Sequence, residues 1–145
     1  MEVVPSLRHL GIGLIPYSPL HAGLLTGMLE AATDGRLPSE QLARVEAYRD
    51  QLEAYENLCR EMDAKPADVA LVWLLGNPVV SATIVGAMTI DELQADLGAL
   101  SVQLDEEIMH RLDQIWPGTG RSAAGIRLVM PGRHGDQQDV ISSIM

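Results

Sequence analysis

The stretch that decides the fold is residues 84–97, which read IVGAMTIDELQADL. Its first two residues end a short apolar run, residues 82–85, that predicts a buried β-strand stopped by Gly86. Thr89 and Glu92 then stand three residues apart, which is the spacing of a capping box that opens an α-helix. A strand, a tight turn and a capped helix in this order form a βα unit, and ligands bind at the carboxyl ends of such strands.

A second stretch of the same kind lies at residues 14–27, which read LIPYSPLHAGLLTG. The short apolar run that Pro16 closes predicts another buried strand, and glycines and prolines make residues 17–38 a predicted loop. Both stretches therefore place small or hydroxyl residues at the carboxyl end of a strand. The helix that follows Gly86 also begins with unpaired N–H groups and a positive dipole end, which favour an anion. A purely structural role for both stretches is the simpler alternative.

Apolar residues at helical spacing predict the other elements. The predicted helices are residues 2–10 ended by Gly11, one long helix from Ser39 to Ala64, a helix from Pro66 to Leu75, a helix from Thr89 through Leu100, and a helix capped by Asp105 and ended by Pro117 and Gly118. The helix that begins at Pro66 is apolar nearly all round, so we expect it to be sandwiched. The fold class is α/β, and its two strands need neighbouring strands that these residues do not supply.

The composition is that of a globular protein and argues against several classes of partner. The 145 residues carry 10 basic and 20 acidic groups, a net charge of −10, which disfavours nucleic acid and anionic membranes. Cys59 is the single cysteine, so no intrachain disulfide can form. We find no signal peptide, no apolar run of membrane length, and no metal-ligand spacing among the four histidines. We therefore expect a cytoplasmic protein without a metal site.

The charge and composition change after Trp116, which divides the chain into two parts. Residues 1–116 have a formal charge of −11, whereas residues 117–145 have a charge of +1 and are rich in glycine without a sustained period. We predict one folded part, residues 1–116, and an extended or disordered tail, residues 117–145.

The two βα stretches resemble the C-terminal half of the aldo-keto reductase family, whose members are (β/α)8 barrels that use a nicotinamide cofactor. The resemblance covers approximately residues 2–118, with both motifs in the family's order and spacing. It implies a partial (β/α)8 TIM barrel comprising about the last two βα units plus flanking helices. Residues 1–116 would then be the NAD(P)-binding side of that barrel. The cofactor-binding residues that the resemblance implies are Tyr17, Ser18, Leu20, Gly86, Ala87, Met88, Glu92 and Asp96.

Three of these positions depart from the family's pattern, and the departures concern charge. Met88 stands where the family often has Arg, Lys or Ser, Glu92 where it often has Gln, and Asp96 where it has Asn. Two carboxylates without a cation would repel a 2′-phosphate, which puts NADP preference in doubt and makes NAD conceivable. Simpler interpretations exist for both acids, because Glu92 also belongs to the capping box and Asp96 also suits a solvated helix face.

The catalytic residues of the resembled family are not matched in this sequence. By the resemblance, the general acid is a Tyr whose pKa a Lys lowers, beside an Asp and a His, all from the first half of the barrel. Tyr17, Tyr48 and Tyr55 do not stand in that context, so we assign no catalytic residue. We expect a fragment of an NAD(P)-dependent aldo-keto reductase that is inactive without a complementing N-terminal half. The alternatives are a small acidic helical module for protein–protein contacts and a remnant without function of its own.

Overall fold

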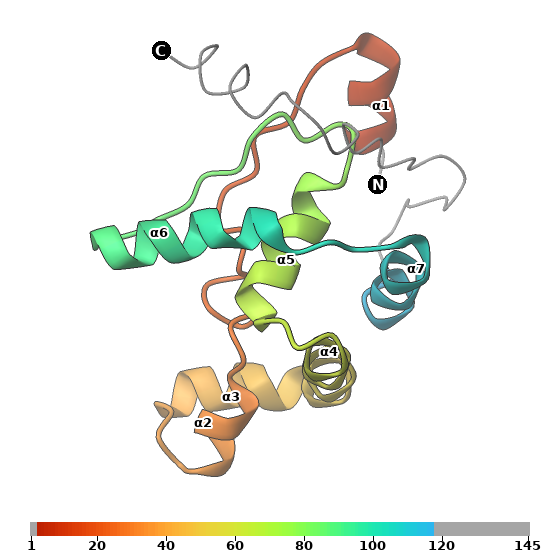
Figure 1. The fold of residues 1–145 in the computed structure, drawn as a ribbon. Helices are drawn as coiled ribbons and strands as arrows, with labels where there is room; N and C mark the ends of the chain where they lie inside the picture. The colour runs from red at the N-terminus through yellow and green to blue at the C-terminus, as the bar shows by residue number, and fades with distance from the viewer. Residues whose placement is uncertain (1–2, 118–145) are drawn as a thin grey trace.

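The computed structural model describes residues 3–117, and its regular elements are helices (Figure 1). In chain order they are α1 (Val3–Leu10), α2 (Leu29–Thr33), α3 (Ser39–Ala47), α4 (Arg49–Glu61), α5 (Pro66–Leu75), α6 (Ile90–Gly98), the 3-10 helix η1 (Ala99–Ser101) and α7 (Glu106–Ile115). The tail predicted for residues 117–145 lies outside the described residues except for Pro117.

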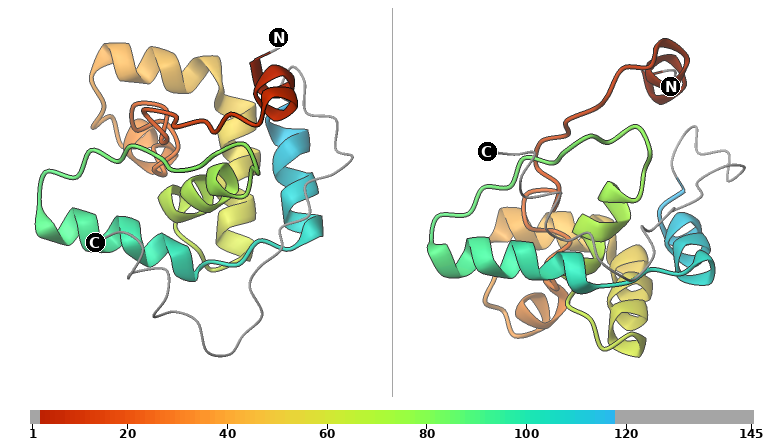
Figure 2. Two further views of the ribbon diagram at one scale, coloured as in Figure 1. Left: turned by 90° about the horizontal axis from the view of Figure 1, so that it is seen from above. Right: turned by 45° about the horizontal axis from the view of Figure 1, so that its top comes forward.

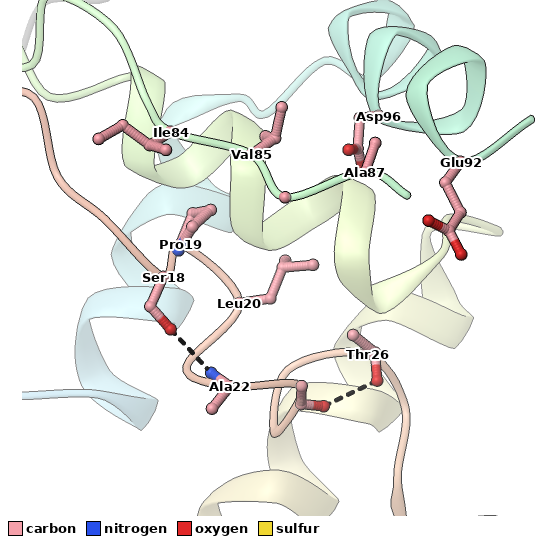
Figure 3. A pocket seen from close by; sticks show the side chains of 12 residues that line it. Ser18, Pro19, Leu20, Ala22, Thr26, Ile84, Val85, Ala87, Glu92 and Asp96 are labelled. Atoms are coloured by element: carbon pink, nitrogen blue, oxygen red, sulfur yellow. Dashed lines mark hydrogen bonds between the residues drawn. The ribbon is translucent and has the colours of Figure 1, made fainter. Parts of the chain in front are cut away.

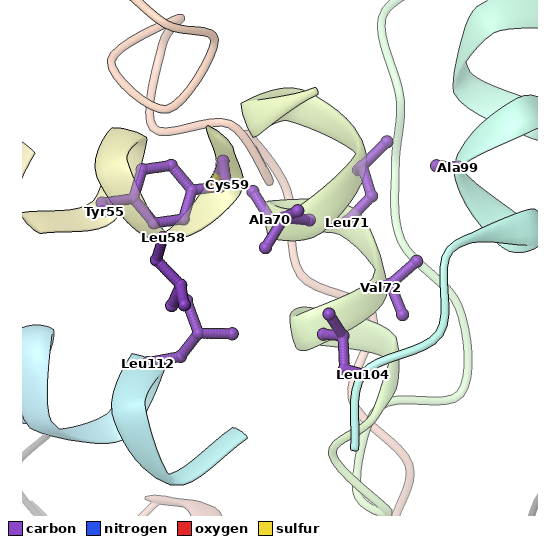
Figure 4. Close-up of a cluster of buried hydrophobic side chains, with 10 residues drawn as sticks. Tyr55, Leu58, Cys59, Ala70, Leu71, Val72, Ala99, Leu104 and Leu112 are labelled. Carbon is purple, nitrogen blue, oxygen red and sulfur yellow. The ribbon is translucent and has the colours of Figure 1, made fainter. Parts of the chain in front are cut away.

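Helix α5 is the centre of the main hydrophobic core, as its all-round apolar sequence predicts. It contacts α4 on one side and α6 with η1 on another, which confirms the predicted sandwich (Figure 2). The buried side chains of this core are Tyr55, Leu58, Cys59, Val69, Ala70, Leu71, Val72, Ala99, Leu104 and Leu112 (Figure 4). Pro66 begins α5 in the first helical turn, where its missing N–H leaves no hydrogen bond unmade. Burying these apolar side chains is the main stabilising contribution in this part of the chain.

The prediction of a single helix from Ser39 to Ala64 is wrong, because the helix is interrupted at Tyr48. Tyr48 has φ −125° and ψ 21°, outside the helical region, and separates α3 from α4. Helix α4 contributes to both hydrophobic clusters of the described residues. Its Leu52 is buried with Val45 of α3 and Leu24 in a second, smaller cluster, whereas its Tyr55, Leu58 and Cys59 belong to the main core against α5.

The two predicted strands are not formed as strands within residues 3–117, and this corrects the sequence-based expectation. Leu14 and Val80 make one parallel bridge, in which the Leu14 N–H donates to the Val79 carbonyl (2.7 Å) and the Ser81 N–H donates to the Leu14 carbonyl (2.9 Å). Val79 beside the bridge is buried, but Ile15 and Ile84 on the same two segments are 59% and 55% exposed. A strand hydrogen-bonds to its neighbours rather than to itself, so two short segments alone cannot build a sheet.

The pairing also slips by one residue beyond the bridge. The Ile84 N–H donates to the Pro16 carbonyl (3.1 Å), so three residues after Ser81 match two residues after Leu14. Pro16 has no N–H to donate to the other segment. The extra residue between Ser81 and Ile84 acts like a β-bulge, which bends a strand pair. Gly13 permits the close approach nearby, because a Cβ on it would lie 2.0 Å from the Ser81 Oγ.

The predicted helix ends are confirmed at three places. Gly11, with φ +64°, ends α1, and the Gly11 and Ile12 N–H groups donate back to carbonyls of the last turn. Thr89 caps α6, and Asp105 caps α7 by accepting from the Ile108 N–H at 2.8 Å. The five-residue helix α2, by contrast, lies in the segment predicted as loop, where its short sequence offers no helical period.

Candidate functional site

The segments singled out in the sequence lie side by side and enclose a cleft of about 600 Å3 (Figure 3). One wall is the loop that follows Pro16, and the other runs from Ile84 into the first turns of α6. The lining residues are Ser18, Pro19, Leu20, Ala22, Gly23, Thr26, Ile84, Val85, Gly86, Ala87, Glu92 and Asp96. The hydrogen bond from the Ile84 N–H to the Pro16 carbonyl joins the two walls where they begin.

The loop wall has an unusual backbone. Ser18, His21 and Ala22 have φ values of 53°, 51° and 52°, in the left-handed region that costs a residue with a Cβ about 1 kcal/mol. The Ser18 Oγ accepts a hydrogen bond from the Ala22 N–H at 3.1 Å, and the Thr26 Oγ1 donates to the Gly23 carbonyl at 2.7 Å. Side-chain oxygens therefore close the turn from within, and non-glycine residues in this conformation concentrate at ligand sites.

The opposite wall consists of small residues followed by the N-terminus of α6. A Cβ built on Gly86 would meet no heavy atom within 4 Å, so the space beside it is open. The capping box is complete, because the Glu92 N–H donates to the Thr89 Oγ1 (3.2 Å) while the Glu92 carboxylate accepts from the Thr89 N–H (3.3 Å). The same carboxylate oxygen accepts from the Met88 N–H at 2.7 Å. The anion at this helix N-terminus is therefore the chain's own Glu92.

The charge of the cleft is negative. Glu92 and Asp96 line it, and its lining residues include no Lys, Arg or His. No group of three or more His, Cys, Asp or Glu residues among residues 3–117 could hold a metal ion. Within the same residues, no helix has the length and apolar character that crossing a bilayer requires.

The structure brings together most, but not all, of the residues proposed for a cofactor. Those that line the cleft are Ser18, Leu20, Gly86, Ala87, Glu92 and Asp96. Tyr17 and Met88 do not line it and are 82% and 88% exposed. Thr26 and Val85 also line the cleft, although they were not among the residues proposed to bind a cofactor. Their signal was position, since Val85 directly precedes Gly86 and Thr26 closes the loop that begins at Ser18.

Comparison with known proteins identifies the family to which this sequence belongs. Residues 1–117 match the model of the aldo/keto reductase family. The chain belongs to this family. It is 41% identical over 120 residues to the uncharacterized oxidoreductase YrpG of Bacillus subtilis, and that match covers 83% of the chain.

Two further relatives agree with this membership. A probable aldo-keto reductase of Glycine max is 33% identical over 122 residues, covering 80% of the chain, and the protein tas of Escherichia coli is 28% identical over 111 residues, covering 72%. The matches cover 37%, 35% and 32% of the three relatives' own lengths. This aldo/keto reductase chain thus spans about a third of the length of these relatives. The similarity identifies it as a homologue of oxidoreductases.

Proposed function

We propose that this chain supplies the dinucleotide-binding part of an NAD(P)-dependent aldo-keto reductase, with carbonyl reduction requiring a complementing N-terminal half. In this proposal the chain is the C-terminal part of a (β/α)8 barrel, in which the segments around Leu14 and Val80 become neighbouring strands. Its place is the cytoplasm, where the free thiol of Cys59 is stable.

One observation carries this proposal. Pro16 and Ile84 are 68 residues apart in sequence, yet the segments that follow them line one cleft. They run parallel at the Leu14–Val80 bridge, as successive strands of a barrel do. The cleft opens beyond the bridge in the chain direction of both segments, which is the carboxyl end where ligands of such barrels bind.

The residues of the cleft fit the nucleoside part of such a cofactor better than a phosphate. Leu20 and Val85 give the cleft an apolar surface, and Gly86 and Ala87 leave room beside the backbone. The Glu92 and Asp96 carboxylates can accept hydrogen bonds from ribose hydroxyls but repel phosphate oxygens. We therefore propose NAD(H) rather than NADP(H) as the preferred cofactor. When bound, this cofactor would supply the hydride for reduction of a carbonyl group.

The part of the reaction that this chain would not perform is proton transfer to the developing alkoxide. That step needs a general acid within hydrogen-bond reach of the substrate oxygen. The cleft contains two hydroxyl side chains, Ser18 and Thr26, and both already make hydrogen bonds with the loop backbone. In the proposal, the acid and its neighbours come from the complementing half, so the chain by itself is inactive.

Cofactor titration tests the proposal directly. We expect NADH to bind the chain more tightly than NADPH in isothermal titration calorimetry. Glu92→Gln should tighten NADPH binding about five- to tenfold and change NADH binding much less, because Gln keeps the capping box while the charge is removed. Asp91→Asn is the matched control, since Asp91 lies in the same first turn but does not line the cleft. Failure of both dinucleotides to bind would contradict the dinucleotide role.

A second candidate function is protein–protein contact, which the exposed apolar face of α6 favours. Ile90, Leu93 and Leu97 are all exposed on this helix, and none of its residues is buried. Co-expression with the unmatched N-terminal portion of the YrpG relative separates the two functions. NADH-dependent reduction of an aromatic aldehyde by the co-purified pair supports the reductase role, whereas a stable pair without activity supports a contact module. Neither pairing nor dinucleotide binding would leave a remnant without function of its own.

A further inference from the structure

The strained loop that walls the cleft is held from outside by helix α3. His21, with φ 51°, lies between the cleft-lining residues Ser18 and Ala22. Its own main-chain bonds are local, since the His21 N–H donates to the Ser18 carbonyl (2.9 Å) and its carbonyl accepts from the Leu24 N–H (3.3 Å). Local bonds of this kind do not fix where the whole loop sits relative to the body of the protein.

Leu24 anchors the far end of the loop in the cluster that contains Val45, and two side chains at the end of α3 hold His21 itself. The Arg44 Nη2 donates to the His21 carbonyl at 2.9 Å across 23 residues of sequence. The ring of Tyr48 meets the ring of His21 edge to face, with centroids 6.2 Å apart and planes at 89°. Arg44 and Tyr48 are four residues apart, so they lie on the same face at the end of α3. Both therefore contact one residue, at its backbone and at its side chain.

The partner of Arg44 differs from those of other arginines in this chain. Arg36, Arg49 and Arg111 pair with carboxylates at the surface. Arg44 donates to a main-chain carbonyl of a distant segment instead. A planar guanidinium with several donors is suited to holding such a carbonyl in one orientation.

We infer that Arg44, supported by Tyr48, is a positioning residue for the cleft. Neither side chain lines the cleft, so both act through His21 on the wall that Ser18, Ala22 and Gly23 form. The break between α3 and α4 has a role in this arrangement, because it ends α3 where Tyr48 reaches His21. The identity of the ligand rests on the proposed function, whereas the control of the loop by Arg44 does not.

Hydrogen exchange followed by mass spectrometry or NMR tests the control of the loop. In Arg44→Met, the amides of Ala22, Leu24 and Leu25 should exchange about fivefold faster, since one hydrogen bond to the loop is lost. The amides of α5 should keep their rates, which shows that the loosening is local. Arg44→Lys should recover a large part of the protection, because Lys can donate to the same carbonyl. Loop exchange that is unchanged in Arg44→Met, or not improved by Arg44→Lys, would overturn the inference.

Binding measurements with the same variants connect the loop to the cleft. The dissociation constant of NADH should rise about threefold or more in Arg44→Met and recover in Arg44→Lys, while Arg36→Met should leave it unchanged. Tyr48→Ala compared with Tyr48→Phe gives a second pair, in which only the variant without a ring should loosen the loop. If wild-type protein binds no dinucleotide, the proposed function fails, and the exchange rates still decide the inference.

Discussion

Two regions of this chain differ in how far their apolar side chains are buried: the helices α4, α5 and α7, and the two extended segments around Leu14 and Val80. Helices α4, α5 and α7 bury their apolar faces against one another, with Leu58 and Leu112 fully inaccessible. On the other side, Ile15 and Ile84 remain exposed on the two segments that the Leu14–Val80 bridge joins. Helices satisfy their backbone hydrogen bonds within themselves, so a few of them can form a core alone. Strands need partners, and on this side residues 3–117 form only the isolated Leu14–Val80 bridge.

Truncation of a buried side chain should have the largest effect on this contrast. Leu58→Ala should lower the free energy of unfolding by about 3 kcal/mol, because it opens a cavity between α4 and its neighbours. Leu100→Ala removes the same atoms from an exposed position and should change the stability by less than about 0.5 kcal/mol. Urea denaturation followed by circular dichroism measures both. Equal losses in the two variants would show that the two sides do not differ as described.

The thiol of Cys59 reports on the same core through its chemistry. Burial raises the pKa of this thiol to about 11, from an ordinary value of 9.0. At pH 8 the native protein should therefore contain about a hundredfold less thiolate and react with iodoacetamide at least that much more slowly than the urea-unfolded chain. The raised pKa also means that this group favours the folded state below pH 9 and ceases to do so as the pH rises through 11. Rapid alkylation of the native protein at pH 8 would contradict a closed core.

The side chain of Tyr55 links α4 to the beginning of α5. The Tyr55 hydroxyl donates to the Pro66 carbonyl, and burial raises the pKa of this phenol, so it stays protonated. Tyr55→Phe keeps the ring in the core and should cost about 1–2 kcal/mol of unfolding free energy, because it leaves a carbonyl without its donor. Chemical denaturation of Tyr55→Phe beside wild type provides the measurement, with Tyr48→Phe at the exposed helix break as the control. A neutral Tyr55→Phe would mean that water replaces the lost donor.

Loss of a helix cap should give the smallest effect, and its extent should differ between the two sides. Thr89→Ala removes the cap of α6 and Asp105→Ala that of α7, each at a cost of about 1 kcal/mol. Because α6 has no buried residue, loss of its cap should appear as faster amide exchange in α6 itself. Since Leu112 anchors α7 in the core, loss of the α7 cap should lower the free energy of global unfolding. The same response to both changes would argue against the difference between the sides.

The helices could be predicted because their signals are local. Spacing located α5 and α7, and the Thr89–Glu92 pair located the start of α6, since each depends on residues within a few turns. The break at Tyr48 could not be foreseen, because one apolar stripe continues through it, with Val45 before the break and Leu52 after it buried in the same cluster. The prediction of the strands was wrong for a related reason. Their apolar sequence is typical of strands buried between neighbouring strands, and residues 3–117 form no such neighbours.

The sequence indicated where a cleft would lie, because both stretches follow segments that run parallel. The residues proposed to bind a cofactor rested on the family resemblance, and of these Ser18, Leu20, Gly86 and Glu92 line the cleft. The exposure of Met88 depends on the direction of the turn before α6, which spacing alone does not define. The contact of Arg44 with His21 joins residues 23 apart in sequence, so no local sequence pattern predicts it.

The one-residue slip opposite Pro16 has a consequence for the solubility of the exposed segments. Stacking of identical chains into fibrils requires straight strands that offer an N–H and a carbonyl at every step. The extra residue between Ser81 and Ile84 bends one segment, and Pro16 removes a donor from the other. Another copy of the chain would therefore find no long, regular template for strand pairing on these two segments.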